Sequence, residues 1–83
     1  MTSTPLKISD ISIIIPTLNE EENIGLLPKS LNSAVGEVLV VDGGSNDKTI
    51  PLAKEKGFRV LSAPPGRAAQ LNHGAAASRG SLL

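Results

Sequence analysis

Three charged side chains, Glu20, Asp42 and Arg67, have the chemistry needed to bind a nucleoside diphosphate. A carboxylate such as Glu20 or Asp42 can accept hydrogen bonds from a nucleobase N–H group or a ribose hydroxyl. Arg67 follows Gly66 at the expected start of a helix, where free backbone N–H groups and a guanidinium group together could hold a diphosphate. These three positions form the centre of a candidate binding site.

Each of these loops also has a structural explanation that needs no ligand. Asn19 can cap a helix, and the glutamates after it can complement the helix dipole, so the first loop supports both interpretations equally. Asp47 is better explained as a helix cap than as a catalyst. Asp42 has no such local explanation and is favoured as a ligand contact, while Gly43 beside it lets a ligand approach the backbone. Arg67 at the positive end of a helix favours an anion there.

No residue of the chain is predicted to be catalytic. His73 is the only histidine, and an imidazole without an acidic partner nearby in the sequence is more typical of an exposed helix residue than of a general base. We expect Gln70 and His73 to share one helical surface with Arg67.

The strands that position these residues are predicted by short apolar runs. Residues 11–15 and 37–41 are nearly uninterrupted runs of this kind, which indicates burial on both faces and hence a parallel sheet covered by helices. Residues 58–62 predict a third strand, and residues 81–83 the start of a fourth.

Three helices are expected between these strands. The first should begin after Asn19 and run to about Leu31, with a kink or early break at Pro28. The second should cover residues 47–56 and end before Gly57 in a left-handed conformation. The third is the Ala-rich stretch 67–79.

This alternation predicts an α/β fold, a Rossmann-like parallel sheet of three to four strands flanked by helices. Ligands in such sheets bind beyond the carboxyl ends of the strands. Pro16 is expected to end the first strand. The loops 16–20, 42–47 and 63–67 should therefore lie together on one rim of the sheet.

Composition narrows the functional classes. The chain has 83 residues and a formal net charge of +0, which predicts one domain at most and argues against a nucleic-acid partner. It has no Cys, which excludes disulfides. No apolar run approaches the roughly 20 residues of a membrane span. These features predict a cytoplasmic protein, with residues 1–10 as a flexible leader and residues 11–83 as the folded part.

Three segments in this order resemble glycosyltransferase family 2: "IIIPTLNEEENI", "EVLVVDGGSNDKT" and "GRAAQLNHGAAASRG". The resemblance implies a GT-A fold and a nucleotide-diphospho-sugar donor, UDP- or GDP-linked, whose sugar passes to a hydroxyl acceptor with inversion. Carried over by position, it implies a donor site in which Pro16, Thr17, Leu18 and Glu20 line the nucleoside pocket. Asp42, with Gly43 beside it, would contact the base or ribose, and Arg67 would approach the base or the diphosphate. Many relatives carry a second aspartate where this chain has Gly43, which leaves open which donor contact is kept.

The larger departure from the family is the Asp-x-Asp segment, which this chain lacks. Its only aspartates are Asp10, Asp42 and Asp47, and none forms that motif. In the family these carboxylates hold Mg²⁺ or Mn²⁺ against the diphosphate, so no metal ligands can be identified in this chain. The catalytic base also lies further along in relatives. We therefore expect an incomplete, N-terminal nucleotide-binding part of a glycosyltransferase, inactive by itself.

Other functions remain open from the sequence. The chain could be a non-catalytic nucleotide- or partner-binding module derived from the same fold, with an exposed sheet edge that mediates self-association. "DGGSNDKT" also resembles an ATP pyrophosphatase loop, but it follows the second strand and begins with Asp. A dinucleotide-binding fold is disfavoured because no GxGxxG follows the first strand.

Overall fold

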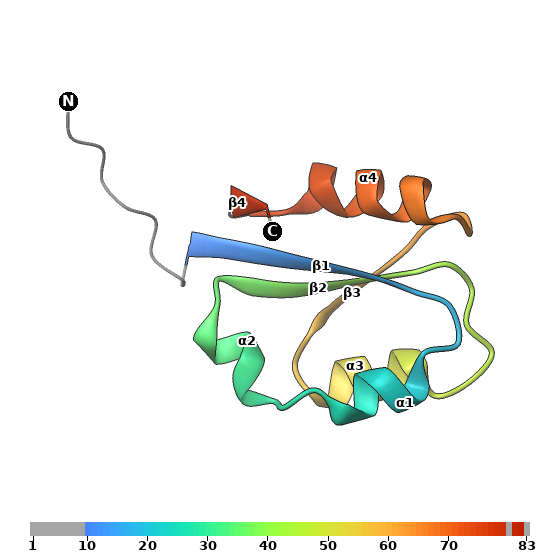
Figure 1. The fold of residues 1–83 in the computed structure, drawn as a ribbon, viewed down its shortest axis with the longest axis horizontal. Coiled ribbons are helices and arrows are strands. Elements are labelled where there is room, and N and C mark those ends of the chain that lie inside the picture. The colour runs from blue at the N-terminus through green and yellow to red at the C-terminus, as the bar shows by residue number, and fades with distance from the viewer. Residues whose placement is uncertain (1–9, 80, 83) are drawn as a thin grey trace.

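The elements form a four-stranded parallel sheet with helices on both faces, as expected for an α/β fold (Figure 1). The structure is a computed structural model that describes residues 10–79, 81 and 82. The strand order is β3-β2-β1-β4, with α4 on one face and α1, α2 and α3 on the other. In chain order the elements are β1 (Ile11–Thr17), α1 (Glu21–Leu26), α2 (Ser30–Ala34), β2 (Glu37–Asp42), α3 (Thr49–Glu55), β3 (Arg59–Ser62), α4 (Arg67–Ala77) and β4 (Ser81–Leu82).

β2 lies at the centre of the sheet, and this position explains its uninterrupted apolar run. All of its residues are buried, because β1 and β3 flank it and helices cover both faces. On the face that carries α1 and α3, a core forms from Ile24, Val38, Val40, Ala53 and Phe58. Burial of this apolar surface stabilises the sheet that carries the candidate loops.

On the other face, α4 packs closely against the sheet. A Cβ atom on Gly74 would stand 2.6 Å from Ile14 Cγ2 and 2.9 Å from Val41 Cγ2. A side chain at this position would therefore separate the helix from the sheet. The start of α4 lies at the same edge as the carboxyl ends of β1 and β2, where the candidate site was expected.

The first helix of the sequence prediction is in fact two helices. The expected interruption at Pro28 is confirmed, but α1 already ends at Leu26, and α2 continues past Leu31 to Ala34. The prediction that Asn19 caps α1 is wrong. Asn19 has a positive φ of 54°, and the cap position belongs to Glu20, which makes no side-chain cap hydrogen bond.

β1 is longer than predicted, because Pro16 lies inside the strand opposite Val41 and does not end it. The Thr17 carbonyl accepts from the Gly43 N–H at 2.9 Å, so Thr17 points its backbone groups towards β2 and Pro16 points its nitrogen the other way. On that side β4 pairs only with Ile11 and Ser12. A proline is tolerated there because, among the residues that the structure describes, no strand pairs with Pro16 on that side.

The remaining boundaries agree with the sequence within a few residues. α3 begins at Thr49 instead of residue 47, and Gly57 after it has a φ of 80°, the left-handed conformation predicted for a C-cap. β3 begins one residue later than expected, and α4 ends at Ala77 instead of residue 79. Residue 83 and the first nine residues of the predicted leader lie outside the described part of the chain.

At the amino edge of the sheet, Glu37 anchors the chain that leaves α4. Its carboxylate accepts from Ser12 Oγ at 2.8 Å and from the Arg79 N–H at 2.5 Å. Arg59 donates to the same carboxylate at 3.4 Å and to the Ala77 carbonyl at 2.9 Å. Burial alone would raise the pKa of Glu37, but these hydrogen bonds outweigh burial and lower it.

Candidate functional site

The loops after β1 and β2 interlock at the carboxyl edge of the sheet. The Asn19 N–H donates to Ser45 Oγ at 2.8 Å, and the Asn46 N–H donates to Asn19 Oδ1 at 2.8 Å. The positive φ of Asn19 permits this exchange, and asparagine tolerates that conformation better than most residues. The function of Asn19 is therefore to join two loops.

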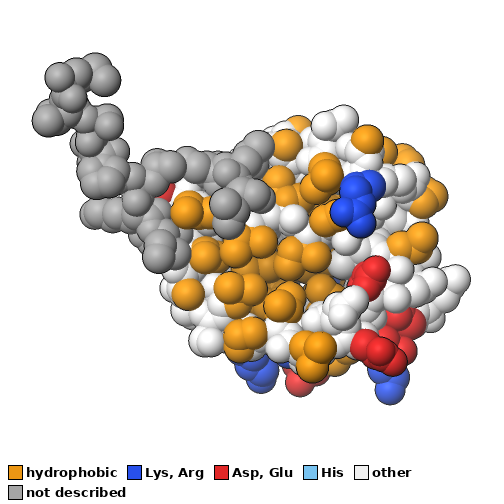
Figure 2. Space-filling model, viewed as in Figure 1, with side chains coloured by type: hydrophobic (Ala, Val, Ile, Leu, Met, Phe, Trp, Pro, Cys, Tyr) orange, Lys and Arg blue, Asp and Glu red, His pale blue; other side chains and the backbone are white. Residues whose placement is uncertain are grey.

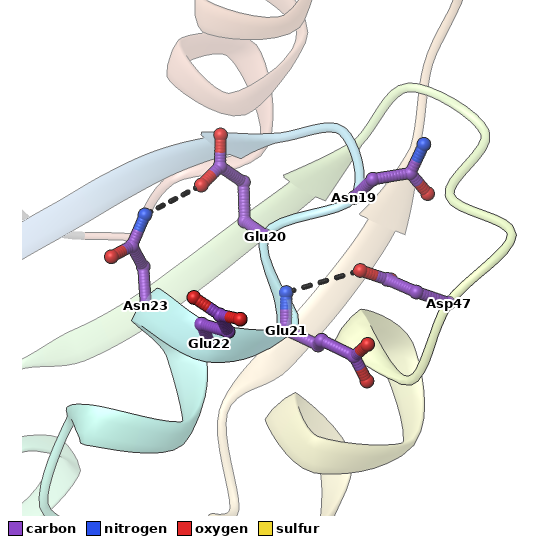
Figure 3. A pocket seen from close by; sticks show the side chains of 6 residues that line it. All are labelled: Asn19, Glu20, Glu21, Glu22, Asn23 and Asp47. Carbon is purple, nitrogen blue, oxygen red and sulfur yellow. Dashed lines mark hydrogen bonds between the residues drawn. The ribbon is translucent and has the colours of Figure 1, made fainter.

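Caps for α1 come from the loop that leads into α3. The Glu20 N–H donates to Thr49 Oγ1 at 2.8 Å. The Glu21 N–H donates to Asp47 Oδ2 at 3.2 Å, as Figure 3 shows. Asp47 also accepts from the Thr49 N–H at 2.9 Å, although the N-cap position of α3 belongs to Lys48 and not to Asp47 as predicted. Burial raises the pKa of Asp47, but the hydrogen bonds from Thr49 and Glu21 outweigh it and lower the pKa. One carboxylate thus serves two helices.

Asp42 lies beneath this rim and is saturated with hydrogen bonds. Its exposed fraction is 1%. Oδ1 accepts from Thr17 Oγ1 at 2.8 Å and from Ser45 Oγ at 2.5 Å, while Oδ2 accepts from the N–H groups of Gly44 and Ser45 at 2.9 and 2.7 Å. Burial raises the pKa of Asp42, but the hydrogen bonds from Ser45, Thr17 and Gly44 outweigh it and hold the pKa below its ordinary value.

A cavity of about 240 Å³ opens where the loops after β1 and β3 meet the start of α4. Five of the seven predicted site residues line it, together with Gly66 and Gln70. Asp42 and Gly43 are not among the lining residues, and both are buried. The lining residues from the prediction are Pro16, Thr17, Leu18, Glu20 and Arg67.

Glu20 and Arg67 bring opposite charges to this cavity from different loops. Glu20 Oε2 accepts from Asn23 Nδ2 at 2.7 Å, which orients its carboxylate (Figure 3). The Arg67 side chain is exposed and forms no hydrogen bond or ion pair with the described residues 10–79 and 81–82. It stands at the first position of α4, whose opening N–H groups have no partner inside the helix. The cavity therefore offers an acceptor on one side and a cationic, N–H-rich wall on the other.

Gln70 is, with Gly66, one of the two lining residues that were not among the predicted site residues. It was expected to share a surface with Arg67 and His73, but it is 4% exposed and faces the sheet, whereas the other two are exposed. Its side chain bonds to backbone atoms of the loops that surround the cavity. Its spacing of four residues from Gly74, the next buried residue of α4, could have indicated this inward position.

A second hollow of about 200 Å³ lies on the outer side of α1, and Figure 3 shows its acidic and amide side chains. It is lined by residues 19–23 and Asp47. Across the described part of the chain, no group of three or more His, Cys, Asp or Glu side chains could hold a metal ion. The described residues thus offer no set of side chains that fits a divalent cation.

The sequence and the fold match known proteins over most of the chain. The family model "Glycosyl transferase family 2" matches residues 12–83. Glucosyl-3-phosphoglycerate synthase from Mycolicibacterium paratuberculosis is 35% identical over 88% of this chain and 26% of its own length. The 4,4'-diaponeurosporenoate glycosyltransferase from Staphylococcus haemolyticus is 46% identical over 63% of this chain and 14% of its own length.

Solved structures show the same architecture. Glucosyl-3-phosphoglycerate synthase from Mycobacterium tuberculosis in complex with phosphoglyceric acid superposes with a TM-score of 0.74 at 34% identity, covering 84% of this chain and 30% of that one. A complex of that enzyme with Mn²⁺, UDP and glucosyl-3-phosphoglycerate has a TM-score of 0.67 at 32% identity, with the same coverage. The chain thus spans less than a third of the length of these relatives. Among the helices that the structure describes, none has the length and apolar character to cross a membrane.

Proposed function

Because the chain belongs to glycosyl transferase family 2 and has the fold of the amino-terminal part of a GT-A domain, we propose that its cavity binds the nucleoside diphosphate of a nucleotide-sugar donor. The observation that carries the proposal is the convergence of Glu20 and Arg67 on one cavity from loops after two different strands. The related structures that contain UDP add support, since they share this fold at 32% identity.

The charges of the cavity suggest how the donor would lie. The nucleoside would occupy the wall formed by Pro16, Leu18 and Glu20, where the carboxylate can accept from a base N–H or a ribose hydroxyl. The diphosphate would face Arg67 and the opening N–H groups of α4. Direct contact of Asp42 with the nucleoside stays a prediction, and it would require Asp42 to give up one of its hydrogen bonds.

In a complete enzyme, the bound donor would pass its sugar to a hydroxyl acceptor with inversion, and this chain alone would lack that activity. Structures of the M. tuberculosis relative contain Mn²⁺ or Mg²⁺ together with UDP. A divalent cation would neutralise charge on the departing diphosphate, but we assign none of its ligands to the described residues. Cytoplasmic location likewise stays a prediction.

Replacing Arg67 with alanine should weaken binding of UDP or GDP about tenfold, because a charge-assisted hydrogen bond to phosphate is lost. Isothermal titration of the purified chain with each nucleotide measures this. Lys54→Ala is the control, since Lys54 is exposed on α3 and lines no part of the cavity. Equal affinities of the wild-type and Arg67→Ala chains for both nucleotides would contradict the proposed orientation.

A second candidate function, a partner-binding module, is favoured by the open edge of β1. Within the described residues, β4 pairs with Ile11 and Ser12 of that strand. Beside the uncovered part lies an apolar hollow of about 280 Å³ whose lining includes Ile15, Ile24 and Leu27. Figure 2 shows apolar side chains gathered over the centre of this view. We propose that a second copy of the chain pairs with this edge.

Sedimentation velocity over a range of concentrations should then show a reversible dimer. Ile13→Lys, which puts a charge on the uncovered part of β1, should leave a monomer that is still folded by circular dichroism. Leu26→Lys is the matched control because Leu26 is 82% exposed on α1 and lies outside the hollow. A wild-type chain that stays monomeric at all concentrations would rule out this pairing.

A further inference from the structure

We propose that Gln70 is a positioning residue that holds the three loops of the donor cavity in their binding arrangement. This inference rests on the proposed function of that cavity. Gln70 is the only glutamine of the chain and is 4% exposed at the base of the cavity, on the inward face of α4. It carries no charge, so any influence on a ligand must come through hydrogen bonds.

Every hydrogen-bonding atom of the Gln70 side chain is already used by the protein. Nε2 donates to the carbonyls of Thr17 and Val41, both at 2.8 Å. Oε1 accepts from the Gly66 N–H at 3.1 Å. A glutamine amide has two N–H donors, and here both are committed to carbonyls. Gln70 therefore cannot donate to a nucleotide without giving up one of these two bonds, and we infer that it acts on a ligand through its neighbours.

Those neighbours lie next to the three loops: two of them at the ends of strands and the third at the start of α4. Thr17 precedes the loop that carries Glu20, Val41 precedes the loop after β2, and Gly66 precedes Arg67. Gly66 has a φ of 133°, which an L-residue rarely adopts, so its N–H needs a defined partner to keep the loop in this path. One amide thus sets the separation between the carboxylate wall and the cationic wall of the cavity.

The presence of glycine at position 43 follows from the same arrangement. A Cβ atom on Gly43 would stand 3.1 Å from Gln70 Oε1 and 3.1 Å from the Cα atom of Pro65. Any side chain there would push against the amide that holds the loops. Gly43 and Gln70 are therefore coupled, because the glutamine amide fills the space that a side chain at position 43 would need.

Loss of this amide should weaken nucleotide binding without unfolding the chain. Gln70→Met keeps the length of the side chain but has no group that donates to the two carbonyls. The loops would then have to become ordered on binding, which lowers affinity. We expect UDP to bind Gln70→Met about tenfold more weakly than wild type, in titrations at a temperature where melting curves show both proteins folded.

Phe58→Leu separates this role from a general loss of stability. Phe58 is buried in the core on the opposite face of the sheet, and its truncation lowers stability without touching the loops. The affinity of folded Phe58→Leu for UDP should equal that of wild type. In amide hydrogen exchange, Gly66 and Gly43 should lose protection in Gln70→Met and keep it in Phe58→Leu.

A measurement on the wild-type chain covers the case in which Gln70→Met does not fold. The side-chain amide of the only glutamine gives one pair of NMR signals. Both protons should exchange slowly with solvent, and both should stay protected when UDP saturates the chain. Fast exchange of either proton, or equal UDP affinity of wild type and Gln70→Met, overturns the positioning role alone. A wild-type chain that binds neither UDP nor GDP overturns the proposed function and the positioning role together.

Discussion

Asp42→Ala is expected to remove most of the free energy of unfolding of the chain. The substitution removes the acceptor of two backbone N–H groups and two hydroxyls at a position that is 1% exposed. Buried donors without a partner cost about 1–3 kcal/mol each, so a total loss of roughly 3–5 kcal/mol is expected. A small domain has a free energy of unfolding of only about 5 kcal/mol or somewhat more. Urea unfolding followed by circular dichroism measures the effect.

Asp42→Asn should lower the free energy of unfolding less than Asp42→Ala does. It keeps the shape of the side chain and removes its charge, so it separates the two contributions. Its carbonyl oxygen can still accept from Gly44 and Ser45, while its NH₂ group can donate to the hydroxyls of Thr17 and Ser45, which then act as acceptors. The variant loses only the charge-assisted part of these bonds. If Asp42→Ala unfolds at the same urea concentration as wild type, the carboxylate does not hold the loops together.

The dependence of stability on pH provides an independent test of the role of the Asp42 carboxylate. The folded pKa of Asp42 is lower than its unfolded pKa, so its contribution to stability is fully present above the unfolded pKa. That contribution is lost as the pH falls through the lower pKa of the folded state. Wild type should therefore lose more stability on acidification than Asp42→Asn, which has no proton to bind at this position.

Gly74→Ala should destabilise the chain by up to about 2 kcal/mol, although alanine usually stabilises a helix. The added methyl group would stand 2.6 Å from Ile14 Cγ2 and 2.9 Å from Val41 Cγ2, so α4 must move away from the sheet. Such overpacking costs about 1–3 kcal/mol, which exceeds the gain in helix propensity of about 1 kcal/mol. Thermal melting and urea titration of the purified variant measure the net result.

Gly25→Ala is the matched control for this prediction. Gly25 is also helical, but it is exposed on α1 and nothing lies within 4 Å of the place its Cβ would take. Alanine there should stabilise the chain by about 0.5–1 kcal/mol. Opposite signs at the two glycines would support the close approach of α4. A stabilising effect of Gly74→Ala would contradict the packing of that helix.

The sequence predicted the sheet well because its signals are local. A run such as residues 37–41 indicates burial on both faces whatever surrounds it, and β2 is indeed the buried centre of the sheet. Pro28 and Gly57 likewise act through their own backbone, and both mark the interruption or end of a helix in the structure. The shared edge of the loops follows from the parallel topology alone, which explains why Glu20 and Arg67 could be placed together.

The finer parts of the site depend on contacts between distant segments and could not be read from local patterns. Asn19 has the residue type of a helix cap, but its partners Ser45 and Asn46 lie 26 and 27 residues away. The bond from Gln70 to the Thr17 carbonyl spans 53 residues. Such pairings depend on how the loops fold over one another, and the spacing of residue types within each loop does not indicate them.

The capping of α1 by Asp47 and Thr49 has a consequence for the order in which the chain folds. These acceptors lie 26 and 29 residues after the N–H groups that they satisfy. A six-residue helix is too short to persist in water by itself. As the chain leaves the ribosome, α1 can therefore become stable only after β2 has emerged and docked beside β1. α1 should therefore remain unstructured during synthesis until residues 47–49 have also emerged.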